Sequence, residues 1–247
     1  MSHLTEFSVH QVYEWYMDIE RRLCEFVRVL PFVEAAQLKE VRSPRLASIL
    51  LEVASLVDTL LRDQLPESFV RANGKTTQQK YANITDYRKE LEPVLSLSRS
   101  QSLLLLGIPS LLSPFAQWAE DLGDCVLPWW RAYNGLKHDR LSRSGEVTLA
   151  DCLQAACALN QVMMNVPIIR GFVFRFGWAQ LAGHNPQMAI NVLGKSADQG
   201  YVAYTDFFAT FLCPVTYQSV DDIRPIDFRN SERLQSHLGR FLNASEI

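Results

Sequence analysis

Residues 128–141, which read PWWRAYNGLKHDRL, contain an arginine and a histidine separated by six residues. On an α-helix with about 100° per residue, Arg131 and His138 lie on one face, roughly 10 Å apart along the axis. A histidine side chain titrates near neutral pH and can act as a general base or acid. A guanidinium group binds phosphate oxygens through paired hydrogen bonds. These residue types indicate that the face has a role other than packing in the core.

The opposite face of the same helix carries residues that suit a protein core. Trp129, Tyr133 and Leu136 fall on this side, and Arg140 falls close to them. Apolar side chains at these intervals are typical of a helix that packs one stripe against its neighbours. We therefore expect the aromatic stripe to be buried and the Arg131 face to be exposed.

Two small or polar residues lie beside the pair. Asn134 offers an amide, and Gly135 lies midway between Arg131 and His138. Glycine inside a helix costs about 1 kcal/mol relative to alanine, so its presence indicates a packing reason. A glycine would let a second backbone approach closely, and Gly135 is the predicted crossing point of a two-fold dimer.

Lys137 and Arg140 add positive charge around His138, and both are predicted to bind substrate. The simpler interpretation is that Arg131 and His138 are solvated surface residues and that Asn134 has no role. The sequence leaves this alternative open.

This region resembles a known family. Arg131 and His138 fit the R-x(4-6)-H motif of HEPN domains, and the string YNGLKHDR is similar to HEPN sequences that read YNxxKHxR. The resemblance covers this helix and the helix expected after it, residues 148–166. HEPN domains are all-α bundles that dimerise with their motifs facing each other. The family usually has a polar residue directly after the motif arginine, whereas this chain has Ala132.

The resemblance implies a metal-independent endoribonuclease, and a role as a defence or toxin-like effector. Arg131, His138 and Asn134 would be catalytic, Lys137 and Arg140 would contact RNA, and the active form would be a homodimer. Neither a metal nor a cofactor is expected. The implied products carry a 2′,3′-cyclic phosphate and a 5′-hydroxyl.

A different class of function competes with the ribonuclease. A HEPN-like helical module could bind a protein or nucleotide partner without cleaving anything. Ala132 favours this alternative, and so does the acidic balance of the chain.

Composition limits the function further. The 247 residues carry a formal net charge of −3, with a pI near 6.0. Non-specific nucleic-acid binding depends on surplus Lys and Arg, so a general nucleic-acid coat is excluded, while a local RNA site is compatible with this charge.

The cysteines and the apolar segments indicate in which compartment of the cell the protein is expected. Five cysteines without a CxxC pair predict reduced thiols in a cytoplasmic protein. The first residues lack the basic start and apolar run of a secretory signal. The most apolar windows, residues 103–118 and 149–178, are interrupted by prolines or polar side chains, so no membrane span is expected.

Capping residues and helical periodicity predict most of the secondary structure. Helices are expected after the Ser8–Gln11 capping box, from Ser43–Pro44 to Pro66, over residues 86–91, from Ser113–Pro114 through Leu122, after the Thr148–Asp151 capping box, and from Asn230 or Ser231.

The fold is expected to be mainly α. Residues 1–176 would form the HEPN-like bundle, and residues 177–247 an α or α+β extension packed on it, or one continuous domain with it. Residues 96–112 fit a short buried strand, an apolar loop or a helix, and residues 201–215 fit a buried helix or a strand pair. The second segment is rich in aromatics but lacks Lys and Arg, which favours core packing over base stacking.

Overall fold

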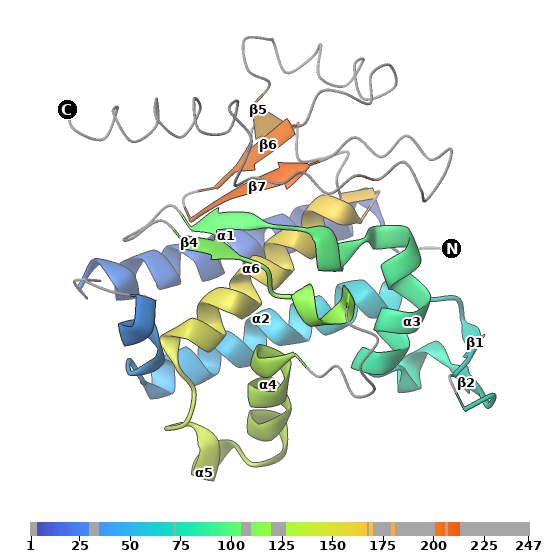
Figure 1. Ribbon diagram of the computed structural model, residues 1–247, viewed down its shortest axis with the longest axis horizontal. Coiled ribbons are helices and arrows are strands. Elements are labelled where there is room, and N and C mark those ends of the chain that lie inside the picture. Colours follow the sequence, from blue (N-terminus) through green and yellow to red (C-terminus); the bar gives the residue numbers. More distant parts are fainter. Residues whose placement is uncertain are drawn as a thin grey trace. The chain divides into compact units, whose positions relative to one another are not determined.

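A computed structural model describes residues 4–29, 35–71, 73–104, 110–119, 127–166, 168–169, 179–180, 201–205 and 207–212. Helices predominate in this part of the chain, which confirms the mainly α class (Figure 1). The described α-helices are α1 Glu6–Arg28, α2 Pro44–Asp63, α3 Ile84–Leu95, α4 Pro128–His138, α5 Arg140–Arg143 and α6 Leu149–Asn165. Short 3₁₀ turns are η1 Ala35–Lys39, η2 Gln79–Tyr81, η3 Leu97–Arg99 and η4 Ala116–Ala119.

The strands form two antiparallel sheets. β1 Ser68–Val70 and β2 Thr76–Gln78 form a hairpin around Asn73 and Gly74, where Gly74 has a φ of 77°. The larger sheet has the order β4-β3-β7-β6-β5. Its strands are β3 Ser102–Leu104, β4 Ser110–Leu112, β5 Ala179–Gln180, β6 Tyr201–Tyr204 and β7 Phe208–Leu212. The sequence left the structure of residues 96–112 and 201–215 open, and both segments contain strands. Strand β3 of the first segment pairs with strand β7 of the second.

Helix starts depend on side chains that bind free backbone N–H groups. Thr148 and Asp151 form the predicted capping box of α6, and Ser43 caps α2 with Pro44 at its first position. The predicted first helix is confirmed as α1, but its predicted capping box was wrong, because Thr5 caps this helix and accepts a hydrogen bond from the Ser8 N–H at 3.2 Å. Ser8 therefore lies inside the first turn.

The helix predicted from Ser113–Pro114 is replaced in the described residues by the short turn η4. The Pro114 carbonyl accepts a hydrogen bond from the indole N–H of Trp129 at 3.0 Å. The Trp118 N–H instead binds the Phe115 carbonyl at 2.8 Å, which gives 3₁₀ geometry. The stretch toward Leu122 and the helix predicted from Asn230 or Ser231 lie outside the described residues.

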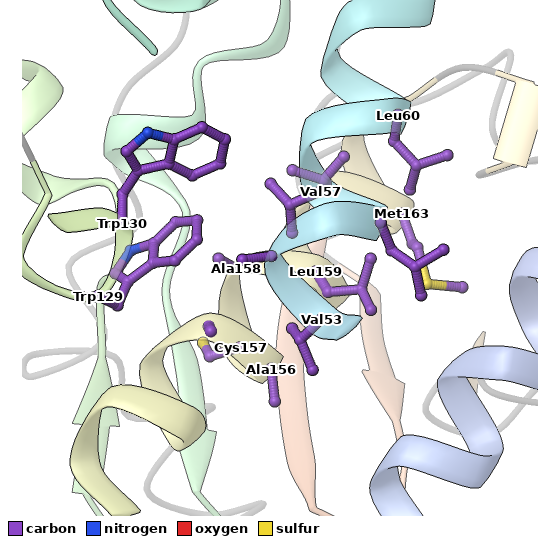
Figure 2. Packing of buried hydrophobic residues seen from close by; sticks show 14 of the residues in the cluster. Val53, Val57, Leu60, Trp129, Trp130, Ala156, Cys157, Ala158, Leu159 and Met163 are labelled. Carbon is purple, nitrogen blue, oxygen red and sulfur yellow. The ribbon is translucent and has the colours of Figure 1, made fainter. Parts of the chain in front are cut away.

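Helix α6 forms the centre of the core. Every residue from 155 to 164 is buried, and α2 runs along this helix. Figure 2 shows Val53 and Val57 of α2 beside Leu159 of α6. Ala156 and Ala158 are small and let the neighbouring elements approach closely. Burying one large apolar side chain contributes about 1.5–3 kcal/mol, so this contact supplies much of the driving force for folding.

Two polar side chains of α6 are also fully buried and bind neighbouring elements. The Asn160 amide donates to the Tyr16 hydroxyl of α1 at 3.0 Å and accepts from the Thr210 hydroxyl of β7 at 2.6 Å. The Gln161 amide donates to the Ser102 hydroxyl of β3 at 3.0 Å. The Ser102 and Thr210 hydroxyls are 2.7 Å apart and connect the two strands. We call these five residues the α6 polar network.

A buried carboxylate fixes the turn between β6 and β7 to α1. One oxygen of Glu20 accepts hydrogen bonds from the Tyr16 hydroxyl at 3.1 Å, from the Phe207 N–H at 3.1 Å and from the Thr205 hydroxyl. Burial, and next the charge of Glu20, hold the pKa of Tyr16 well above its ordinary value. Phe207 and Phe208 are buried beside this turn, as expected for core aromatics.

The chain divides into two compact units, Met1–Pro214 and Val215–Ile247, and the second lies outside the described residues. The first unit includes the strands of residues 179–212 together with the helices. The boundary near residue 176 stays a prediction. No helix among the described residues is both long and apolar enough to cross a membrane.

Replacing Asn160 with alanine should lower the free energy of unfolding by about 1–3 kcal/mol, because the Thr210 hydroxyl then lacks its acceptor inside the core. Urea denaturation followed by circular dichroism measures this change. Gln154→Ala is the matched control, because Gln154 is only half-buried on the same helix. This control should change the free energy by less than about 0.5 kcal/mol. If Asn160→Ala and Gln154→Ala lowered the free energy of unfolding equally, the α6 polar network would not contribute to stability in the way we expect.

Candidate functional site

Helix α4 carries the predicted site and ends at His138, earlier than the sequence suggested. Pro128 occupies the first turn, where its missing N–H needs no partner. Asp139 leaves the helical conformation, with φ −147° and ψ 74°, and its side chain accepts from the Ser142 N–H at 3.2 Å. Arg140 therefore begins α5 and is exposed, so its predicted place beside the core stripe was wrong.

The aromatic stripe is buried, as predicted, and it fixes how α4 is rotated. Trp129, Tyr133 and Leu136 are each at most 4% exposed. The Trp129 ring meets the Phe115 ring edge to face, with 5.9 Å between centroids. Trp130 is also buried, and Figure 2 shows both indoles beside α6. Aromatic contacts of this kind have preferred geometries, so they set the direction of the opposite face.

The opposite face of α4 presents the predicted functional residues to solvent. Arg131, Lys137 and His138 are exposed, and Asn134 and Gly135 are half-buried. The Lys137 ammonium lies 5.6 Å from the centroid of the Tyr133 ring. Arg131 and His138 share this exposed face, as the helical spacing requires, about 10 Å apart along the axis.

A residue that the sequence interpretation missed lies against this face. A Cβ placed on Gly135 would lie 2.8 Å from Nη1 and 3.1 Å from Cδ of Arg143. The Arg143 side chain of α5 therefore lies directly over the glycine of α4. Gly135 thus has a packing reason within its own chain, and the dimer crossing stays a prediction. In the sequence, Gly135 indicated close packing at this position. Which side chain packs there depends on the helix break at Asp139, which the sequence interpretation did not include.

Further basic residues adjoin α5. The Arg140 guanidinium donates to the Ser48 hydroxyl on α2 at 3.2 Å. Arg45 is exposed one turn before Ser48, and Arg42 is exposed where residue 42 pairs with Thr148. Among the residues that the structure describes, no salt bridge involves any of these arginines. The surface is therefore locally basic on a chain whose net charge is −3.

His10 and Glu14 lie four residues apart on α1, a spacing that can offer two metal ligands on one helix face. Both side chains are exposed. Within the described ranges, no three His, Cys, Asp or Glu side chains gather closely enough to hold a metal ion.

No protein-family model, curated protein or solved structure matches the chain.

Cys152 and Cys157 are poor nucleophiles. Cys24, Cys152 and Cys157 are buried, and the Cys152 thiol lies 3.2 Å from the Leu46 carbonyl. Burial raises the pKa of Cys157 to about 12 and also raises the pKa of Cys152. Because the thiolate is the reactive form, Cys152 and Cys157 do not supply a covalent catalyst at neutral pH.

Iodoacetamide at pH 8 should leave Cys152 and Cys157 unmodified in the native protein and should modify both in urea, as peptide mass spectrometry would show. An unfolded thiol ionises near pH 8.5, so the stability that Cys157 contributes is complete below this pH and is lost as the pH rises toward about 12. Rapid modification of native Cys157 would contradict this placement.

Proposed function

We propose that the chain is a metal-independent endoribonuclease of HEPN type. The observation that carries the proposal is that Arg131 and His138 share the exposed face of α4, while the opposite face is held in the core by Trp129 and Tyr133. A role as a cytoplasmic defence or toxin-like effector belongs to the same proposal.

The residue types suit RNA cleavage without a metal. The 2′-hydroxyl oxygen attacks the adjacent phosphorus as a base removes its proton, and the bond to the 5′-oxygen breaks as an acid protonates that oxygen. Arg131 would stabilise the charge on the phosphorane oxygens. His138 would serve as base or acid, and the His138 of a second copy would take the other role. The products are a 2′,3′-cyclic phosphate and a 5′-hydroxyl.

The neighbouring residues support substrate binding. Lys137 is exposed one residue before His138, and Arg140 is exposed on α5, so both can reach phosphates outside the scissile one. The half-buried Asn134 offers an amide that can donate to a phosphate oxygen or orient the 2′-hydroxyl.

Two observations favour a non-catalytic interaction module instead. Leu141 is 95% exposed on α5, next to the basic surface, and Ala132 packs against the core where the family motif usually has a polar residue. A protein partner with an acidic surface would complement the arginines beside Leu141.

The purified protein should cleave single-stranded or structured RNA in the presence of EDTA. His138→Ala and Arg131→Ala should each lower the rate by about 10²–10⁴, since each removes a group that acts on the reacting phosphate. Gel analysis of labelled RNA gives the rate, and chromatography identifies the cyclic phosphate. His10→Ala is the matched control, because His10 is exposed on a different helix, and it should cleave as fast as the parent.

Three outcomes would reject this proposal. Cleavage by His138→Ala at the parent rate would place the chemistry elsewhere. No cleavage by the parent under any activating condition would favour the interaction module, and cleavage only with added divalent metal would indicate a different site.

The protein should be a dimer, with a mass in light scattering of twice the chain mass of 28.2 kDa. Gly135→Leu should weaken association, because a bulky side chain blocks the approach of a second helix. Arg143→Ala is the control, since it removes the side chain that covers Gly135 and keeps the glycine. A monomer at micromolar concentration, or equal weakening by both variants, would exclude a crossing at Gly135.

A further inference from the structure

The guanidinium of Arg143 lies against α4 at the position of Gly135. Gly135 is four residues after Arg131 and three residues before His138. With a rise of 1.5 Å per residue, the glycine lies about 6 Å along the axis from Arg131 and about 4.5 Å from His138. Arg143 covers this glycine, so its guanidinium stands between the two motif residues.

The chain positions Arg143 through the helix break. Asp139 caps α5 with its side chain, and its carbonyl accepts from the Arg143 N–H at 3.2 Å. Arg140 binds Ser48 on α2 and fixes the other side of the short helix. The Arg143 backbone is therefore held beside α4, and the side chain extends over the one position of the face that has no Cβ.

The Arg143 charge has no acid to neutralise it among the described residues. None of the described salt bridges involves Arg143. Glu146, three residues after Arg143, is the acid nearest in sequence, and the carboxylate of Asp139, four residues before it, accepts the Ser142 N–H. The Arg143 residue is exposed, and a guanidinium offers five N–H donors in one plane, so one edge can rest on the glycine while another binds an anion.

We propose that Arg143 is an RNA phosphate-binding residue. The lack of a side chain at Gly135 allows the Arg143 guanidinium to lie in line with Arg131 and His138. Arg131, Arg143 and His138 form one basic row, in which Arg143 holds a phosphate next to the scissile one. This inference rests on the proposed ribonuclease function and adds a substrate-binding residue from outside the motif.

The variant Gly135→Ala changes the position of the Arg143 guanidinium without removing its charge. The added methyl would overlap Nη1 of Arg143, the far end of a flexible side chain, so the guanidinium must move while every charge is kept. Alanine is also the better helix former, and the thermal midpoint should not fall. A loss of RNA binding in this variant therefore cannot come from an unfolded helix.

The test measures binding of a single-stranded 2′-O-methyl RNA, which lacks the attacking hydroxyl and cannot be cleaved. Arg143→Gln and Gly135→Ala should each weaken binding, and the slope of log K against log salt should fall by about 0.7 in magnitude for each lost phosphate contact. The double variant should bind no worse than Arg143→Gln alone, because both changes remove the same contact. Arg28→Gln, which removes an exposed arginine from α1, should leave the slope unchanged.

The outcomes separate this inference from the proposed function. Unchanged binding and slope in Arg143→Gln, or additive losses in the double variant, would overturn the role of Arg143 even if the parent cleaves RNA. Salt-dependent binding through Arg143 by a parent that never cleaves unmodified RNA would reject the ribonuclease and keep the binding residue. No binding by the parent at low salt would overturn both.

Discussion

The structure depends on the burial of α6 along ten consecutive residues. A helix in that position cannot turn polar side chains to water, so Asn160 and Gln161 must find partners inside the protein. Their partners come from α1, β3 and β7, which are far apart along the chain. The same hydrogen bonds that satisfy the helix therefore also specify where α1 and the larger sheet pack, since an apolar core would not discriminate among orientations so strongly.

The candidate site inherits its geometry from this core. Helix α4 packs against both α2 and α6, with the indoles of Trp129 and Trp130 buried in the core. Because the aromatic face of α4 is buried, the basic face on the opposite side of the helix is exposed. The break at Asp139 folds the chain back, and Arg143 returns to the helix that precedes it. Function at this surface would thus draw on two short helices held by one set of buried contacts.

The sequence was informative where structure is local. Capping residues located α2 and α6, and helical spacing separated the buried stripe from the exposed Arg131 face correctly. Non-local contacts could not be foreseen: β3 pairs with β7, and the indole of Trp129 takes the Pro114 carbonyl that a helix would have used. The position of Arg143 depended on a helix end set by Asp139, and aspartate is common both inside helices and at caps. The function itself stays a proposal, because exposure shows that residues are accessible and not what they bind.

The pairing of β3 with β7 also affects how the chain folds during synthesis. Ser102 and Thr210 are separated by 108 residues, and Asn160 and Thr210 by 50 residues. At a translation rate of about 5–20 residues per second, the ribosome needs about 3–10 s to proceed from Asn160 to Thr210. During this interval Asn160 has been synthesised, but Thr210, which donates to its amide oxygen in the finished fold, has not. The Asn160 amide therefore cannot reach its partner on β7 until Thr210 has been synthesised, and a chain that ends between these two residues leaves part of the α6 surface uncovered, which chaperones would recognise.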